Sequence, residues 1–163
     1  MSDKARDFAI EAHGDQTYGD GQPYRVHLFA VHQVVRDFGY DGPYAEAAWL
    51  HDVLEDTPIT FSQLSANFSG QVCSLVLACT GEGKNRRERN ACIYDRISRY
   101  PQAAIVKVAD RIANVEASAE GSSHRSMYRK EADAFWSAVA RHVPDTMQDR
   151  LSRAYIAQRD QSS

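Results

Sequence analysis

Apolar residues recur along this chain every three or four positions, the spacing that places them on one face of an α-helix. The pattern is clear from Leu28 to Phe38 and stops at Gly39, a residue type that commonly follows the end of a helix. No stretch alternates apolar and polar residues as a half-buried strand would, and no internal repeat or low-complexity linker divides the chain. The pattern therefore predicts an all-α fold, arranged as one compact helical array.

The expected helices follow one another with short connections. Two of them open on a capping-box pattern, in which a polar residue is followed three positions later by Gln or Glu, at Thr60 and at Asn85. The stretch 14–21 is rich in Gly, Asp and Gln, so we expect a polar loop after the first helix. In chain order, the expected helices cover residues 5–12, 28–38, 43–54, a short segment after Thr60, and 71–79, 85–97, 101–115, 123–141 and 145–158.

Length, charge and cysteine content narrow the function classes. The 163 residues are 43% hydrophobic and 25% charged, an ordinary balance for a globular protein, so we expect a single domain over residues 1–163. The net charge of -3 argues against a nucleic-acid binder, which would carry a strong basic excess. The three cysteines form no C-x-x-C pair, which suits a reducing compartment. The chain has no long apolar run and no apolar signal core near Met1. We therefore expect a soluble cytoplasmic protein without a membrane partner.

The densest group of ionisable residues is the segment 51–56, His-Asp-Val-Leu-Glu-Asp. If this segment is helical, Asp52 lies three and four positions from Glu55 and Asp56, so the three carboxylates share one face. Carboxylates that close raise one another's pKa unless a cation neutralises their charge. The segment therefore predicts a bound divalent metal ion.

A second polar face lies on the expected helix 101–115, where Lys107, Asp110 and Asn114 follow helical spacing among apolar residues. Another imidazole, His27, lies near the start of the second helix, three positions after Tyr24. Together with the His-Asp pair of the segment 51–56, these residues offer a mixed nitrogen and oxygen ligand set. Such a set suits Mn²⁺, Fe²⁺ or a similar cation, whereas a thiolate-rich zinc site is excluded by the composition.

Three motifs contain most of these residues: Pro-Tyr-x-x-His ending at His27, His-Asp-x-x-Glu-Asp-Thr beginning at His51, and Val-Ala-Asp-Arg-x-x-Asn ending at Asn114. In this order and at these separations they resemble the HD hydrolase domain of RelA/SpoT proteins and the small stand-alone alarmone hydrolases, which are metal-dependent phosphohydrolases of the HD superfamily. The resemblance covers residues 5–117. It implies an all-α fold of the HD-domain type over this range, with the C-terminal helices packing on it.

The resemblance implies a role for the residue at each matching position. It implies catalytic acids at Glu55 and Asp56, which would orient a water molecule or relay its proton beside the metal. It implies metal ligands, most often for one Mn²⁺, at His27, His51, Asp52 and Asp110. We expect substrate contacts at Tyr24, Lys84, Arg86, Tyr94, Lys107 and Asn114.

The activity that the resemblance implies is release of pyrophosphate from the 3′ position of the alarmones ppGpp or pppGpp, giving GDP or GTP, as part of a stringent response. The chain departs from the family at Thr17-Tyr18, where alarmone hydrolases often carry a basic pair, and at Leu28, where a proline is common. These differences bear on the guanine end of the pocket. Replacement positive charge is available in the cluster Lys84, Arg86, Arg87 and Arg89.

Other interpretations remain open at the level of sequence. The same ligands would serve an HD phosphohydrolase acting on another nucleotide, such as a deoxynucleoside monophosphate or NADPH, and a nucleotide-binding regulatory module without turnover would keep the same fold. The basic cluster has the alternative of a solvated helix face, and Tyr24 and Tyr94 that of ordinary packing. The segment 126–136 either packs over the core or closes the substrate pocket. A homo-oligomer is compatible with the sequence.

Overall fold

Helices form nearly all of the regular structure of this protein, which confirms the expected all-α fold. The computed structural model describes residues 2–19, 21–119 and 121–156. The helices are α1 (Ser2–His13), α2 (Tyr24–Asp37), α3 (Pro43–Leu50), α4 (Val53–Asp56), α5 (Phe61–Asn67), α6 (Gly70–Ala78), α7 (Arg86–Arg99), α8 (Ala103–Ala117), α9 (Ser123–Val139), the 3-10 helix η1 (Ala140–His142) and α10 (Asp145–Ile156). Within the described ranges, no helix is both long and apolar enough to cross a membrane.

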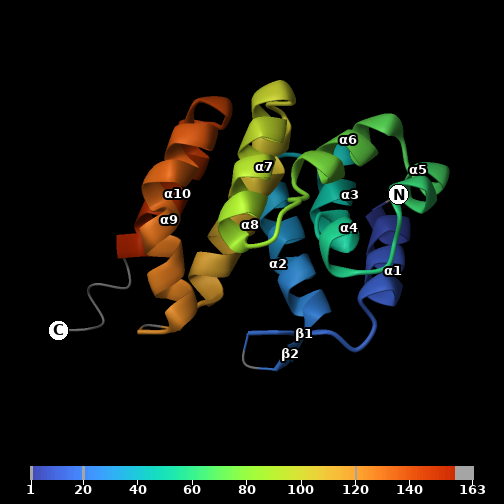
Figure 1. The fold of residues 1–163 in the computed structure, drawn as a ribbon, viewed down its shortest axis with the longest axis horizontal. Coiled ribbons are helices and arrows are strands. Elements are labelled where there is room, and N and C mark those ends of the chain that lie inside the picture. Colours follow the sequence, from blue (N-terminus) through green and yellow to red (C-terminus); the bar gives the residue numbers. More distant parts are fainter. Residues whose placement is uncertain (1, 20, 120, 157–163) are drawn as a thin grey trace.

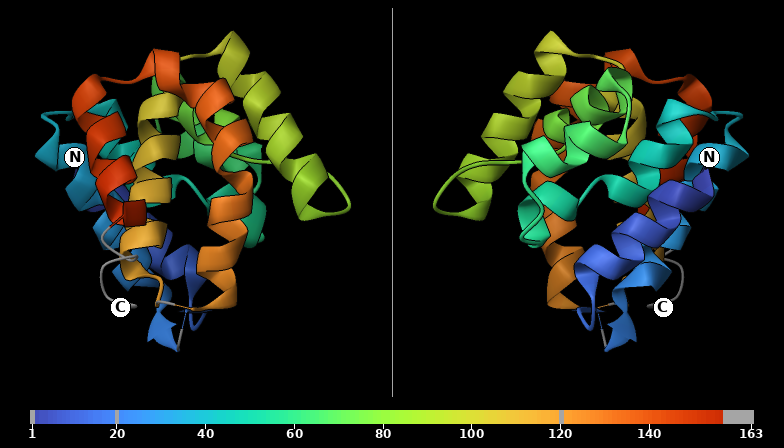
Figure 2. Two further views of the ribbon diagram at one scale, coloured as in Figure 1. Left: turned by 90° about the vertical axis from the view of Figure 1, so that its left-hand side faces the viewer. Right: turned by 90° about the vertical axis from the view of Figure 1, so that its right-hand side faces the viewer.

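Helix α8 is the centre of the arrangement. It packs against α2, α3, α6, α9 and α10, and residues on almost every side of it are buried. In Figure 1, α9 and α10 lie at one end of the molecule and α1 and α5 at the other, with α2 and α8 between them. The side views of Figure 2 show the α9–α10 pair beside α8. Asp110 and Arg111 of α8 are therefore buried in the interior of the molecule.

The two capping-box predictions had different outcomes. At Thr60 the box is complete, because its hydroxyl accepts from the backbone N–H of Gln63 and the Gln63 side chain accepts from the N–H of Thr60. At Asn85 only half of the box forms. The Asn85 side chain accepts from the N–H of Glu88, but the Glu88 carboxylate accepts from the N–H of Lys84 instead.

The expected helix 43–54 is interrupted, so its prediction as one element was wrong. Helix α3 ends at Leu50, His51 and Asp52 form a turn, and α4 begins at Val53. The imidazole Nδ1 of His51 lies 2.8 Å from the carbonyl oxygen of Ala48, the acceptor that the N–H of Asp52 would use if the helix continued. A side chain that competes in this way for a backbone acceptor favours a turn over a continued helix.

The polar loop contains a short hairpin that the sequence pattern did not predict. Strands β1 (Thr17–Tyr18) and β2 (Gln22–Pro23) pair antiparallel, with Tyr18 opposite Gln22. Two-residue strands leave no alternation to detect in a sequence. The hairpin lies beside the first turn of α2, at the lower edge of the molecule in Figure 1.

The remaining helices differ from the predictions only at their ends. Helix α8 begins at Ala103, two residues after the expected start at residue 101, and the expected segment 123–141 ends in the 3-10 turn η1. The expected end of the last helix at residue 158 lies outside the described residues.

Replacing Thr60 by Ala should lower the free energy of unfolding by about 1 kcal/mol, because the first turn of α5 loses its capping acceptor. Urea denaturation measures this difference. Ser62→Ala, two positions further in the same helix, is the matched control and should lose less stability than Thr60→Ala. An equal loss in both variants would mean that the cap contributes nothing.

Candidate active site

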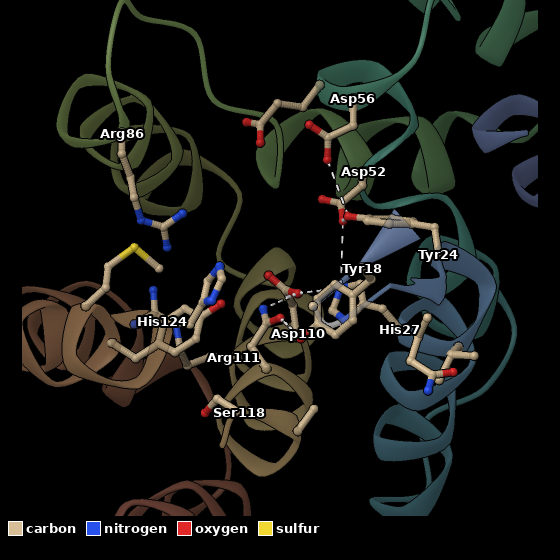
Figure 3. A pocket seen from close by; sticks show the side chains of 18 of the residues that line it. Tyr18, Tyr24, His27, Asp52, Asp56, Arg86, Asp110, Arg111, Ser118 and His124 are labelled. Atoms are coloured by element: carbon tan, nitrogen blue, oxygen red, sulfur yellow. Dashed lines mark hydrogen bonds and ion pairs between the residues drawn. The ribbon is translucent and has the colours of Figure 1, made fainter. Parts of the chain in front are cut away.

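One large pocket, with a volume of 690 Å³, opens between the hairpin, α2, α4, α7, α8 and α9. Figure 3 shows its two sides. Asp52, Asp56, Tyr24 and His27 lie on one side, and Arg86 and His124 lie across the opening. The segment 126–136 packs over the core, where Phe135 is fully buried, and Met127 of the same segment lines the pocket.

Two imidazoles and two carboxylates converge at the floor of the pocket from three separate segments, with His51 buried behind the lining residues. His27 comes from the first turns of α2, His51 and Asp52 from the α3–α4 turn, and Asp110 from the middle of α8. The Nε2 atom of His27 lies 3.1 Å from Oδ1 of Asp110, and Nε2 of His51 lies 3.0 Å from Oδ2 of Asp52. Nε2 of His51 is also 3.4 Å from Oδ1 of Asp110, which joins the two pairs into one cluster.

This cluster has the chemistry of a metal site. One ligand atom each from His27, His51 and Asp52 lies within 4.8 Å of the other two. His51 is only 1% exposed, and its Nε2 has no hydrogen-bond partner among the described residues although carboxylates surround it. Because the Ala48 carbonyl can only accept, the Nδ1 of His51 carries a proton, which leaves Nε2 as the nitrogen that would bind a cation. A divalent cation that accepts nitrogen and oxygen ligands fits these residues.

The charges in the cluster stabilise one another strongly. Burial lowers the pKa of His51, but the carboxylates of Asp52 and Asp110 raise this pKa by more than burial lowers it, so the net shift is upward. Burial raises the pKa of Asp110, but the positive charges of Lys107 and His51 lower it well below its usual range. Lys107 contributes through an ion pair of 3.1 Å between its Nζ and Oδ2 of Asp110. Both aspartates therefore remain available as anionic ligands.

Glu55 and Asp56 form a second acidic group with Asp52 at the edge of the cluster. Burial, followed by the negative charges of Asp52 and Glu55, raises the pKa of Asp56 to about 6. The hydroxyl of Tyr24 donates to Asp52 and lies 3.4 Å from Oδ2 of Asp56, so it bridges the two carboxylates.

The loop between α6 and α7 fixes the position of Glu55. Its Oε1 accepts a hydrogen bond of 2.7 Å from the backbone N–H of Gly81. A Cβ atom at Gly81 would lie 2.5 Å from the carbonyl oxygen of Arg89, so only glycine lets the loop pass this close to the backbone of α7. Glu55 is thus positioned by a backbone group.

The opposite wall of the pocket carries positive charge organised by Glu131 of α9. Glu131 accepts from Nε of Arg86 at 2.6 Å and from Nη2 of Arg111 at 3.3 Å. The Arg111 side chain is 2% exposed, and its guanidinium lies 4.9 Å from the ring centroid of Tyr128 and 4.2 Å from that of Phe135. These contacts hold two guanidinium groups on one carboxylate.

The structure brings most of the expected site residues together. Three of the four expected metal ligands line the pocket, and so do Glu55 and Asp56. The fourth ligand, His51, is buried just behind the pocket wall. Four of the expected substrate contacts also line it: Tyr24, Arg86, Lys107 and Asn114.

Two expected substrate contacts lie elsewhere. Lys84 is exposed on the loop before α7 and is not among the pocket-lining residues. Tyr94 is also absent from the lining, because its ring packs edge to face against Phe135, with centroids 6.4 Å apart. Neither side chain reaches the pocket in this conformation.

Sequence reasoning missed several residues of the pocket. Arg111 follows Asp110 in the third motif, and Tyr18 lies in the loop whose composition departs from the family, so both had a signal nearby. Tyr128 and Glu131 lie in the segment 126–136, which the sequence left open between core packing and closure of the pocket. Tyr128 lines the pocket, and Glu131 acts from behind it, because α9 packs beside α7 and α8. Arg89 was named as part of the basic cluster, and it does line the pocket.

Comparison with known proteins connects this geometry to a family. Residues 5–144 match the HD domain family. A guanosine-3′,5′-bis(diphosphate) 3′-pyrophosphohydrolase of Aquifex aeolicus is 33% identical over 118 residues, covering 69% of this chain and 17% of that protein. The pyrophosphohydrolase MESH1 of Danio rerio is 34% identical over 115 residues, covering 66% of this chain and 63% of that protein.

The same comparison extends to solved structures. A metazoan ortholog of SpoT, described as hydrolysing ppGpp, superposes with a TM-score of 0.76 over 96% of this chain and 94% of that one, at 21% identity. The two proteins therefore share a fold. The chain spans less than a fifth of the length of several relatives it matches, including the Aquifex aeolicus and Escherichia coli proteins.

Replacing Glu131 by Ala should lower the free energy of unfolding by about 3 kcal/mol, because the buried Arg111 guanidinium loses its counter-ion. The control is Asp95→Ala, which breaks the exposed pair with Arg99 and should cost at most about 1 kcal/mol. Urea denaturation of both variants gives the comparison. Similar small losses would show that the charge of Arg111 is compensated without Glu131.

Proposed function

We propose that this chain, which belongs to the HD domain family, is a metal-dependent phosphohydrolase that releases pyrophosphate from the 3′ position of ppGpp or pppGpp. The observation that carries the proposal is the convergence of His27, His51, Asp52 and Asp110 on the floor of a pocket whose far wall is cationic. The curated relatives with 33% and 34% identity support it, because their names describe this reaction.

The residues proposed to hold the cation are His27, His51, Asp52 and Asp110. A divalent metal ion bound there supplies a Lewis acid that polarises a phosphoryl oxygen and lowers the pKa of a water molecule. We propose Mn²⁺ as the metal, since imidazole nitrogen and carboxylate oxygen suit it, as they do Fe²⁺ or a similar cation. Lys107 and Asn114 contact Asp110 from the same helix and keep its carboxylate oriented.

Glu55 and Asp56 are the proposed catalytic acids. In the reaction a water oxygen bonds to the phosphorus attached to the 3′ oxygen, and the bond between that phosphorus and the 3′ oxygen breaks. The 3′ oxygen takes up a proton, leaving GDP or GTP and pyrophosphate. In this proposal Glu55, held by Gly81, and Asp56, beside the Tyr24 hydroxyl, would accept the proton of the water and deliver it to the 3′ oxygen.

The cationic wall is the proposed site for the substrate phosphates. Arg86 lines the pocket and is already oriented by Glu131, so its guanidinium is pre-arranged to pair with an anionic oxygen. Tyr24, Lys107 and Asn114 are the other proposed substrate contacts. Lys84 and Tyr94 do not line the pocket, so we give them no role in substrate contact.

We further propose that the enzyme acts on the free nucleotide in the cytoplasm and takes neither nucleic acid nor a membrane as a partner. The net charge of -3 is unfavourable for binding polyanions, and the three free cysteines suit a reducing compartment. Assembly into a homo-oligomer is compatible with this function.

The test of the proposed function is pyrophosphate release from ppGpp by the purified protein with Mn²⁺. We expect release that disappears after chelation of the metal and in Asp52→Ala, which removes a ligand. Asp149→Ala, an exposed carboxylate on α10, is the matched control and should keep full activity. If the wild-type protein binds Mn²⁺ without releasing pyrophosphate, the proposal fails. A panel with deoxynucleoside monophosphates and NADPH then separates a different nucleotide substrate from nucleotide binding without turnover.

Asp56→Asn should separate catalysis from metal binding. Because Asp56 contacts Tyr24 and is not a proposed ligand, we expect Mn²⁺ affinity close to that of the wild type. The turnover number should fall by roughly 10²- to 10⁴-fold, the usual contribution of a general acid or base. Calorimetry and steady-state kinetics measure the two quantities. Loss of metal affinity in this variant would reassign Asp56 to the ligand set.

A further inference from the structure

Tyr18 lies where the hairpin meets the proposed metal cluster, and none of the roles above includes it. It is half-buried in β1, and its ring stacks on the imidazole of His27, with centroids 4.6 Å apart and an interplanar angle of 17°. Figure 3 shows the Tyr18 ring in front of His27, beside Asp110. The hairpin therefore places one aromatic ring directly against a proposed metal ligand.

His27 needs such a support more than His51 does. A histidine that binds a metal through one nitrogen usually has its ring fixed by a hydrogen bond from the other nitrogen. His51 has this bond, to the Ala48 carbonyl. The Nδ1 of His27 is buried without a hydrogen-bond partner among the described residues, so no such bond sets the rotation of its ring. The stacked ring of Tyr18 restricts that rotation instead.

The hydroxyl of Tyr18 reaches a second ligand through a chain of hydrogen bonds. It donates to Oδ1 of Asn114 at 2.6 Å, and Nδ2 of Asn114 donates to Oδ1 of Asp110 at 2.9 Å. The first bond fixes which way the Asn114 amide points, because its oxygen faces Tyr18 and its nitrogen must then face Asp110. The hydroxyl of a tyrosine is protonated at neutral pH and therefore acts as the donor in this chain.

A second tyrosine beside the hairpin completes the arrangement. Tyr24 follows β2 directly, donates to Asp52, and meets Tyr18 edge to face with centroids 6.0 Å apart. Its ring is also stacked on His13 of α1, with centroids 4.4 Å apart. Through these contacts, Tyr18 and Tyr24 touch or orient three of the four proposed ligands: His27, Asp52 and Asp110.

We propose that Tyr18 is a positioning residue for the metal site, setting the ring plane of His27 by stacking and the carboxylate of Asp110 through Asn114. This inference rests on the metal cluster of the proposed function but not on the identity of its substrate. It gives the hairpin a role in metal affinity. It also explains how a neutral side chain serves at this position, since Tyr18 acts on the ligands and needs no charge of its own.

The test measures binding of Mn²⁺ and Co²⁺ alone to the full chain, without a nucleotide. Tyr18→Ala removes both the stack and the hydrogen bond, and we expect its metal affinity to fall by roughly 10- to 100-fold, the usual effect of losing a residue that orients ligands. Tyr18→Phe keeps the stack and removes only the bond to Asn114. Its affinity should fall less, and the visible absorption of bound Co²⁺ should shift because Asp110 is less well oriented.

The control is Tyr44, a tyrosine of similar exposure that packs against Tyr40 away from the pocket. Tyr44→Ala and Tyr44→Phe should leave metal affinity and the Co²⁺ spectrum unchanged. An Asn114→Ala variant tests the hydrogen-bond chain, since its effect on affinity should not add to that of Tyr18→Phe if both act through one path. If Tyr18→Ala does not fold, the Phe variant and this pair still decide the question.

Unchanged metal affinity and an unchanged Co²⁺ spectrum in the Tyr18 variants would overturn the proposal. A raised KM for nucleotide with normal metal binding would overturn it too, because Tyr18 would then be a substrate contact. Failure of the proposed function has a different signature. The wild-type protein would bind metal without releasing pyrophosphate, and the effects of the Tyr18 variants on metal affinity would remain readable.

Discussion

Ionisable side chains are buried where α2, α8 and the α3–α4 turn meet, and the rest of the pocket depends on how their charges are compensated. The side chains of His27, His51 and Asp110 are each less than a tenth exposed, so water solvates them poorly. Each imidazole lies against a carboxylate, because a buried polar group without a partner would destabilise the fold. The turn at His51 and Asp52 makes this possible, since it directs two consecutive side chains to one point.

Much of this arrangement could be predicted from the sequence, for reasons that differ between elements. The long helices were predictable because their apolar residues repeat with the helical period, as from Leu28 to Phe38. The gathering of His and Asp residues was predictable because charged residues among apolar ones need compensation. The break after Leu50 was not, because it depends on a contact between the His51 ring and one carbonyl group. The same limit applies to the hairpin, whose strands are too short to leave a pattern.

The two walls of the pocket differ in charge, and each is stabilised from behind. Carboxylates of the α3–α4 region form one wall, and the guanidinium groups held by Glu131 form the other. Arg86 lines the pocket and Lys84 does not, although both are basic and close in sequence. Arg86 lies on α7 within reach of Glu131, whereas Lys84 lies on the preceding loop and faces solvent. Which of these basic residues lines the pocket is therefore decided by tertiary contacts with α9.

The proposed ligands come from segments that are far apart in the chain, and this has a consequence for the lifetime of the protein. A cation held by His27, Asp52 and Asp110 would join α2, the α3–α4 turn and α8 at a single point, as a covalent cross-link does. Any ligand that binds only the native state stabilises it in proportion to the logarithm of its free concentration. A lower supply of metal in the cell would then raise the fraction of molecules that open and meet a protease, so metal starvation would lower the amount of the protein as well as empty its site.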